Sequence, residues 1–170
     1  GATNTPLGTT GAGTTVSSGA ALDLNGFTLG TAEALTLNGT GVSSGGALMN
    51  TGNAATYSGL ITLGSASSIV GGTGTIAITN AGRIFGSGFA LTLGGAQGGS
   101  LASIVGTGSG TLTKADAGSW TLSGASTYTG ATTISAGILK LGAAGGATNT
   151  PLGTTGAGTT VSSGAALDLN

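Results

Sequence analysis

The opening stretch of this chain recurs at its end without a single substitution. Residues 1–25 read GATNTPLGTTGAGTTVSSGAALDLN, and residues 146–170 read the same, so Gly146 repeats Gly1. A fold tolerates far more divergence than this between two of its parts, so complete identity indicates a tandem array rather than a two-lobed domain. We therefore predict one full repeat period over residues 1–145, followed by the start of the next identical period over residues 146–170.

Charged residues are scarce, at 4% of the chain, against roughly a quarter in ordinary globular proteins. A formally neutral array has no basic surface for nucleic acid or for an anionic membrane. The sequence also contains no run of about 20 apolar residues, which is the length that a membrane-spanning helix needs. Low charge also removes the repulsion that keeps proteins apart. We expect adjacent repeats of the same chain as partners, with lateral or end-to-end self-association, no nucleic acid and no membrane insertion. One period carries three acids and three bases: Asp23, Glu33, Asp116, Arg83, Lys114 and Lys140.

Glycine accounts for 38 of the 170 residues, which makes disorder the alternative to a folded chain. Against disorder, the mean hydropathy is +0.41, and Val, Ile, Leu and Thr are plentiful, whereas disordered chains are poor in aliphatic residues. Apolar and polar residues alternate in short runs, for example over 75–79 and 138–141. This alternation is typical of half-buried strands, so we expect an all-β fold without α-helix.

A shorter motif recurs within the period, in which a β-branched residue is followed by Ser or Thr and by small residues that include Gly. Together with fainter starts between its copies, the motif predicts about six or seven coils of a parallel β-solenoid in each period. Coils that stack at ~4.8 Å would advance a period of seven coils by ~34 Å. Because no coil buries its faces alone, stability depends on neighbouring coils. The motif starts at Val16, Val42, Ile78, Ile134 and Val161.

Residues 110–142 read GTLTKADAGSWTLSGASTYTGATTISAGILKLG and resemble the autotransporter-associated β-strand repeat of bacterial passenger domains. The sequence departs from the usual pattern at Asp116, Trp120 and Ser126. The resemblance implies a right-handed parallel β-helix that is secreted and displayed on a bacterial surface, and it says almost nothing about activity. The residues that carry it are Gly110, Leu112, Lys114, Leu122, Gly124, Tyr128, Gly130, Thr132, Ile134, Gly137, Leu139 and Leu141.

The sequence offers no constellation for catalysis. Polysaccharide cleavage needs paired carboxylates or a base flanked by cations. We expect Asp23 and Glu33 to be solvated charges on the outside, and Lys114 and Asp116 to form a weak exposed pair. The chain lacks Cys and His, and its glycine runs lack the Asp of calcium solenoids and the Gly-Lys-Ser/Thr of phosphate loops. We predict no enzyme activity, no cofactor, and no catalytic, cofactor-binding or metal-binding residues.

Three aromatic residues are candidates for stacking on sugars, as in an adhesin. For Trp120 and Tyr128 a place in the core or at a turn is the favoured alternative, and Tyr57 is the third candidate. Thr-x-Thr pairs, as at Thr111 and Thr113, would suggest ice binding if they stacked, but they are scattered, and the coil count predicts no common register for them.

These observations favour a structural repeat of a long extracellular β-solenoid fibre on a bacterial cell surface, with a role in scaffolding, cohesion or coating. The alternative is an adhesin passenger that binds glycans or neighbouring cells through a lateral face. An enzyme on a β-helix scaffold is the least favoured of the three, because the acids are few and far apart.

Overall fold

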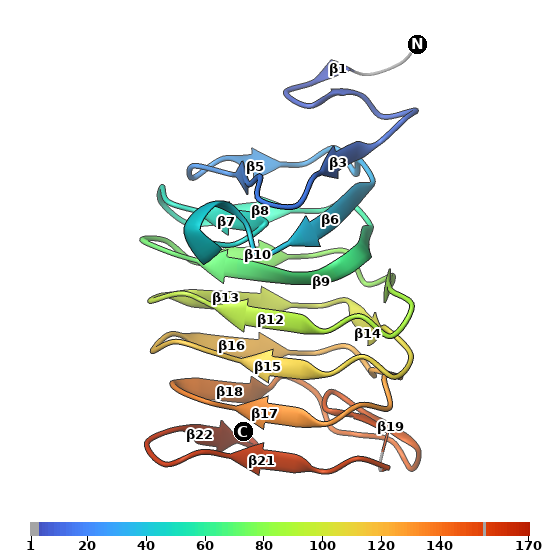
Figure 1. Cartoon of the computed structure of the whole chain (residues 1–170), viewed down its shortest axis with the longest axis vertical. Coiled ribbons are helices and arrows are strands. Elements are labelled where there is room, and N and C mark those ends of the chain that lie inside the picture. Colours follow the sequence, from blue (N-terminus) through green and yellow to red (C-terminus); the bar gives the residue numbers. More distant parts are fainter. Residues whose placement is uncertain (1–3, 155) are drawn as a thin grey trace.

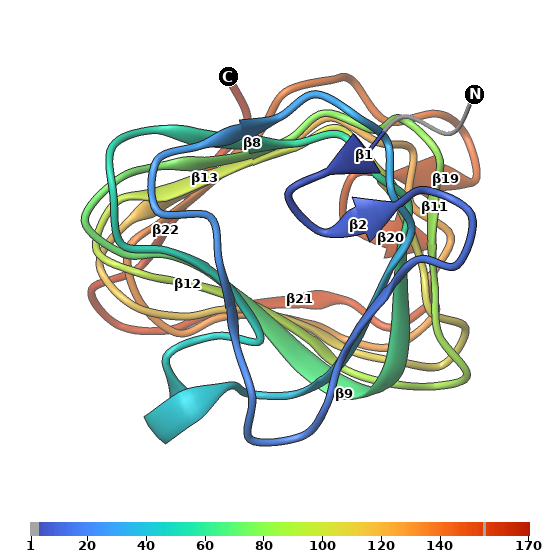
Figure 2. The same ribbon diagram turned by 90° about the horizontal axis from the view of Figure 1, so that it is seen from above.

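The computed structural model describes residues 4–154 and 156–170 as a stack of coils, with residues 4–9 at one end of the stack and residues 159–170 at the other (Figure 1). Residues 1–3 and 155, which fall within the two predicted copies, lie outside the described residues. Seen from above, the chain turns clockwise as it runs away from its N-terminal end, so the solenoid is right-handed (Figure 2). Within the described residues the only helical element is a short 3₁₀ turn, η1 (Val42–Ser44). The predicted all-β, right-handed parallel β-solenoid is confirmed.

One sheet forms the back of the solenoid in Figure 1, and we call it the back sheet. Each of its strands pairs in parallel with the strand one coil away, for instance Ile76 with Ala55 on one side and with Gly99 on the other. Among the described residues it contains β5 (Thr28–Leu29), β8 (Ala55–Tyr57), β10 (Ile76–Ile78), β13 (Gly98–Leu101), β16 (Ser119–Leu122), β18 (Ile138–Leu141) and β22 (Ala166–Asp168).

The second large sheet bends around a corner, because the long strand β9 (Ile61–Gly71) contributes to two faces. The side face contains β3 (Thr14–Val16), β6 (Leu35–Gly39), the first half of β9, β11 (Arg83–Phe85) and β14 (Ile104–Gly106). The front face contains β4 (Leu22–Asp23), β7 (Leu48–Asn50), the second half of β9, β12 (Leu91–Gly94), β15 (Leu112–Lys114), β17 (Thr132–Ile134) and β21 (Thr159–Val161).

Alternation along each short strand sends one set of side chains into the core, where they stack on the equivalent residues of the coils above and below. In β10, Ile76 and Ile78 are buried while Ala77 between them is partly exposed. Burial of each such side chain contributes about 1.5–3 kcal/mol. One ladder of paired residues on the front face crosses six coil-to-coil steps, which agrees with the predicted six or seven coils. It runs Leu22, Leu48, Ile69, Leu93, Lys114, Ile134, Val161.

The corners between faces are held by buried polar groups as well as by glycine. Asn50 is fully buried at the end of β7 and bonds to the coils on both sides of its own. Its Nδ2 donates to the carbonyls of Asn53 and Thr75 at 2.6 and 2.9 Å, and its Oδ1 accepts from the backbone N–H of Gly26 at 2.9 Å. A corner has fewer backbone partners than a strand, so one amide that satisfies several backbone groups fixes the turn and the stacking together.

Two small antiparallel hairpins interrupt the parallel order, β1 (Asn4–Thr5) with β2 (Gly8–Thr9), and β19 (Asn149–Thr150) with β20 (Gly153–Thr154). The first lies over the N-terminal end of the coil stack (Figure 2), where Leu7 packs against the core. The second lies beside the side face, where the N–H of Ser126 donates to the carbonyl of Thr150 and the N–H of Thr154 donates to the carbonyl of Tyr128, both at 3.0 Å. The described part of the chain has no helix long and apolar enough to cross a membrane.

Candidate functional surface

The charged residues do not converge. In residues 4–154 and 156–170 no group of three His, Cys, Asp or Glu side chains comes close enough to hold a metal ion. Asp23 is exposed, as predicted, and its carboxylate accepts hydrogen bonds from Thr51 and from the N–H of Asn25. These bonds lower the pKa of Asp23 in spite of the opposing effect of burial, which is the largest single contribution. Asp23 is therefore a turn-forming carboxylate.

Glu33, predicted to be a solvated outward charge, is instead buried, with 2% of its surface exposed. It lies at the start of the side face in the same alternation as Leu35 and Leu37, and this alternation points it inward. The hydroxyl of Thr14, one coil away, donates to its carboxylate at 2.5 Å, and the hydroxyl of Tyr57 donates to its backbone carbonyl at 2.5 Å. Its hydrogen bonds tie neighbouring coils together.

Lys114 is also inside the protein, so the predicted exposed pair with Asp116 is wrong. Its side chain is completely buried in the ladder between Leu93 and Ile134. The ammonium group donates to the carbonyls of Ala115, Asp116 and Ala136 at 2.5, 2.9 and 3.1 Å. Burial lowers the pKa of Lys114, and the nearby charge of Asp116 partly opposes this effect. Three carbonyls match the three donors of an ammonium group, which explains how a lysine can occupy a core position.

We expect Lys114→Ala to lower the free energy of unfolding by about 3–5 kcal/mol, because it opens a cavity and leaves three carbonyls without their donor. Lys114→Met keeps most of the buried volume, so it should cost clearly less. Urea unfolding of the two variants beside the parent chain measures both values. A loss under about 1 kcal/mol for Lys114→Ala would instead match an exposed ion pair and contradict the buried position.

All three aromatic candidates for sugar stacking are buried. Trp120 donates from its indole N–H to the carbonyl of Gly94 at 2.9 Å, and the Tyr128 hydroxyl lies 2.6 Å from the hydroxyl oxygen of Thr132. The core position favoured for Trp120 is confirmed, and Tyr128, predicted to pack at a turn, is fully buried. Tyr57, with no exposed surface, cannot offer a face to a ligand. A sugar platform built on these rings is therefore excluded.

The buried tyrosines predict a loss of stability in alkali. Burial raises the pKa of Tyr128 to about 12, and burial with the nearby charge of Glu33 raises that of Tyr57. An unfolded tyrosine ionises near pH 10. The stability that each buried, un-ionised tyrosine contributes is therefore complete below about pH 10 and is lost as the pH rises toward about 12. Each buried tyrosine should remove about 1.4 kcal/mol per pH unit in that window.

Urea unfolding at intervals between pH 9 and 11.5 tests this expectation, with Tyr128→Phe as the matched control. The phenylalanine variant should lose stability less steeply than the parent, since it has one ionising group fewer. Equal slopes for the two chains would show that Tyr128 titrates normally in the folded state.

The exposed aromatic residues were not among the sequence candidates. Phe85 is 53% exposed on the side face, and the guanidinium of Arg83 lies 5.6 Å from the centroid of its ring. Two Arg83 nitrogens also donate to the carbonyl of Gly106, at 3.0 and 3.2 Å, which fixes the side chain over the next coil. The signal in the sequence was the run Arg83-Ile84-Phe85, in which Ile84 alternates inward and its neighbours therefore point out. A cation beside an aromatic ring is the most distinctive feature of this otherwise plain surface.

Threonines also stack in register, contrary to the expectation from the coil count. Thr113 lies in an outward ladder on the front face, beside Thr92 on one coil and Thr133 on the next, and Thr160 continues it. The flanking outward positions hold Ala, Gly, Ser and, in one coil, Thr111. The result is one column of hydroxyl groups, without the second parallel column that repeated Thr-x-Thr pairs would supply.

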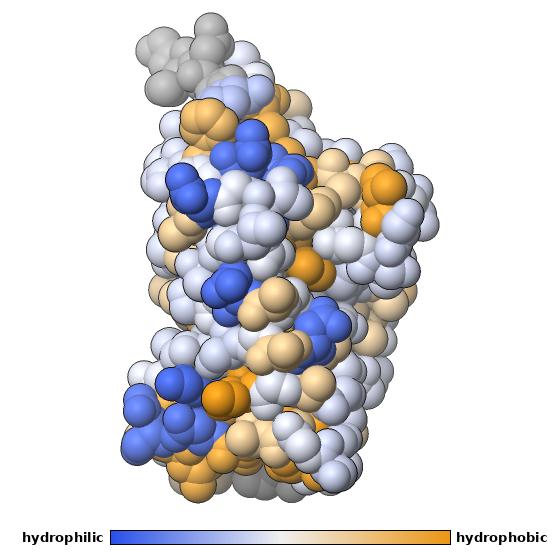
Figure 3. Space-filling model, turned by 90° about the vertical axis from the view of Figure 1, so that its left-hand side faces the viewer, coloured by the Kyte–Doolittle hydropathy of each residue, from blue (hydrophilic) through white to orange (hydrophobic). Residues whose placement is uncertain are grey.

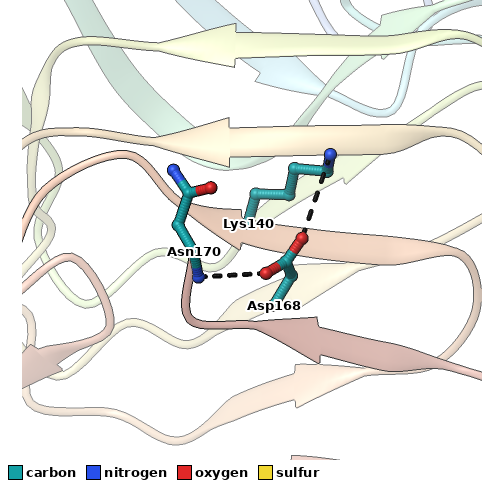
Figure 4. A network of polar contacts seen from close by, with 3 residues as sticks. All are labelled: Lys140, Asp168 and Asn170. Carbon is teal, nitrogen blue, oxygen red and sulfur yellow. Dashed lines mark hydrogen bonds and ion pairs between the residues drawn. The ribbon is translucent and has the colours of Figure 1, made fainter.

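Elsewhere the surface combines small polar residues with single exposed apolar side chains. The face shown in Figure 3 has separate hydrophilic and hydrophobic spots on a pale background, and one lobe protrudes on its right-hand side. One polar contact near the C-terminal end joins Lys140 to Asp168 at 3.9 Å, while the N–H of Asn170 donates to the same carboxylate at 3.0 Å (Figure 4). The side chains of this ion pair are 42% and 43% exposed, so the pair adds at most about 1 kcal/mol.

The hollow at the N-terminal end does not gather reactive groups either. It has a volume of about 190 Å³ and lies between the first hairpin and the first coil, lined by Pro6, Leu7, Leu22, Asp23, Leu24, Phe27 and Leu29. Asp23 is the only titratable residue in that lining, and its carboxylate already accepts bonds from Thr51. A general acid and base pair needs two such groups within reach of one substrate, which this lining does not supply.

Residues 112–141 match the family model described as the passenger-associated-transport-repeat. This stretch carries an autotransporter passenger-type repeat. The match starts with the first residue of β15 and ends with the last residue of β18, so the passenger-type repeat spans two front strands and two back strands and contains both Lys114 and Trp120. No curated protein and no solved structure matches the chain. A passenger-type repeat points to an extracellular or surface-exposed protein.

Proposed function

We propose that this chain is a structural repeat of a long β-solenoid fibre on a bacterial cell surface, where it acts as a scaffold, a cohesive element or a coat, without enzymatic activity. The observation that carries the proposal is the unbroken front-face ladder from Leu22 to Val161 in a chain whose opening stretch returns at its end. Each coil both covers and is covered by another, so adding periods adds length without changing the cross-section. Adjacent repeats of the same chain are then its main partners.

The size of the native polypeptide tests the covalent array. We expect surface material from the source cells, dissolved in denaturant and probed with an antibody to residues 1–145, to run far above the 15.5 kDa of this chain on a denaturing gel. A band near 15.5 kDa would instead indicate short subunits that stack without a covalent link, and it would overturn the proposal. Incubation with polysaccharides should release no product, and turnover would contradict the non-enzymatic role.

A second candidate function is an adhesin, favoured by the exposed pair of Arg83 and Phe85. Sugars stack on aromatic faces and accept hydrogen bonds from guanidinium groups, so this pair is where a lateral glycan site would form. A glycan array with the parent chain and with Phe85→Ser separates the two functions. Phe27→Ser is the matched control, because Phe27 is 66% exposed and directly precedes β5 of the back sheet, whereas Arg83 lies in β11 of the side face. Saturable binding lost only in Phe85→Ser would favour the adhesin, and absence of binding would favour the scaffold.

A further inference from the structure

The two identical segments, 1–25 and 146–170, have the same local structure where both are described. Both form a hairpin with equivalent pairing, Thr5 with Gly8 in one and Thr150 with Gly153 in the other. Both make the same turn, in which the N–H of Ala20 donates to Ser17 at 2.9 Å and that of Ala165 donates to Ser162 at 3.0 Å. The glycine before the turn has a φ of +67° in the first copy (Gly13) and +68° in the second (Gly158). The glycine within the turn has a φ of +79° in the first copy (Gly19) and +80° in the second (Gly164).

The same two segments nevertheless lie on different faces of the solenoid. In the first copy Val16 pairs with Leu37 on the side face, and Leu22 pairs with Leu48 on the front face. In the second copy Val161 pairs with Ile134 on the front face, and Leu167 pairs with Leu139 on the back sheet. The surroundings differ accordingly. Asp23 bonds to Thr51, whereas its counterpart Asp168 pairs with Lys140.

The front-face ladder gives the size of the difference. It leads from Leu22 to Val161 in six coil-to-coil steps. The counterpart of Leu22 is Leu167, which lies one face beyond Val161 along the chain, on the back sheet. We infer that one period, residues 1–145, makes six turns plus one of the three faces, so that each period is rotated by a third of a turn relative to the one before it.

This rotation determines how lateral surfaces repeat along an array. A feature that occurs once per period, such as the exposed pair of Arg83 and Phe85, returns to the same side only after three periods. Three periods make 19 turns, because the three additional faces add up to one full turn. At ~4.8 Å per turn, this is a length of about 90 Å. A flat partner surface would meet the same feature at that spacing, while the three sides of the fibre would be chemically equivalent over long distances. The rotation is a property of the array that the proposed structural role does not require.

Disulfide trapping tests the placement in the chain itself, which has no cysteine of its own. Thr133 and Thr160 are direct neighbours on adjacent coils, at a separation that a disulfide can bridge. Without the rotation, Thr160 would take the place that Thr15 has on the side face, beside Thr127. We expect the double variant Thr133→Cys/Thr160→Cys to form a disulfide under mild oxidation, and Thr127→Cys/Thr160→Cys to stay reduced.

The double variant Thr113→Cys/Thr133→Cys is the positive control, because these residues pair in the same ladder one coil earlier. Quantification of free thiols and peptide mass spectrometry measure all three variants. With the control oxidised, a disulfide between positions 127 and 160, or no disulfide in either test variant, would overturn the inference. Disulfides in both test variants would show two placements and would overturn it equally.

A longer chain provides an independent measurement. A polypeptide of three consecutive periods with Ser87→Cys in each period carries one exposed thiol per period on a loop after the side face. Gold particles attached to these thiols and viewed down the fibre axis by electron microscopy should point in three directions. Labels that all project to one side would show a whole number of turns per period and contradict the rotation.

Discussion

Gly98→Ala is expected to lower the free energy of unfolding by about 3–5 kcal/mol, although it adds only one methyl group. Gly98 has a φ of +74°, a conformation that costs an L-residue roughly 1–2 kcal/mol. A Cβ at this position would also lie 2.1 Å from the carbonyl oxygen of Ser119 on the next coil. Backbone cannot yield as a side chain does, so the coils would have to separate locally at the start of β13.

Gly19→Ala is the matched control for this effect. Its φ is +79°, nearly the same as that of Gly98, but a Cβ there meets no atom within 4 Å. The control should therefore show only the backbone cost of roughly 1–2 kcal/mol. Urea unfolding, together with hydrogen exchange at β13 and β16, measures the difference. If both variants lost the same stability, close stacking of coils at this corner would be ruled out as the cause.

Trp120→Ala is the second large effect, and we expect it to cost about 4–5 kcal/mol. Trp120 is fully buried, and in its ladder it lies between Gly99 and Leu139. Gly99 contributes no side chain to this ladder, so truncation of Trp120 leaves a cavity that its neighbours in the ladder cannot fill. The carbonyl of Gly94 also loses the indole N–H that it accepts.

Trp120→Leu distinguishes lost volume from a lost functional ring. Leucine restores most of the apolar contact with Leu139, so we expect a loss of about 1–3 kcal/mol and slower local hydrogen exchange than in Trp120→Ala. Equal losses for leucine and alanine would mean that the hydrogen bond to Gly94, rather than the packing, governs the site. A Trp120 variant that kept the full stability of the parent but no longer bound a ligand would contradict the buried position of the Trp120 ring.

The alternation of Leu, Ile and Val with Thr predicted most of this fold, because each strand has one buried side and the same rule applies in every coil. The assignment of charges to the outside fails at Lys114 and Glu33, where the alternation itself places a charged residue inside. That assignment overlooked that backbone carbonyls at a corner can satisfy an ammonium group. The stacking of threonines on the front face was missed because coils differ in length. In the back sheet, fewer residues separate Trp120 from its partner Leu139 than separate Leu139 from its partner Leu167. A coil count that assumes equal coil lengths therefore places the threonines out of register.

The exposed pair of Arg83 and Phe85 shows a different limit. Its alternation was readable from the sequence, but its proximity to Gly106 depends on how the coils align, which no single strand specifies. The position of the repeated segment was also unpredictable, since two identical sequences take two different faces according to the coil on which they are laid. The residues of the segment determine the shape of its turn, and the neighbouring coil determines its orientation.

Parallel stacking of short coils has a consequence for how such a chain acquires its structure. Each strand of the two large sheets finds its partner one coil away along the sequence, as Trp120 does with Leu139 and Leu139 with Leu167. Contacts between distant parts of the polypeptide are not needed. A chain released end-first from a narrow pore can therefore complete one winding with each new coil that emerges, and the finished windings act as the template for the next. Growth in one direction on a ready template also keeps little unfolded polypeptide exposed at any moment, whatever the final length.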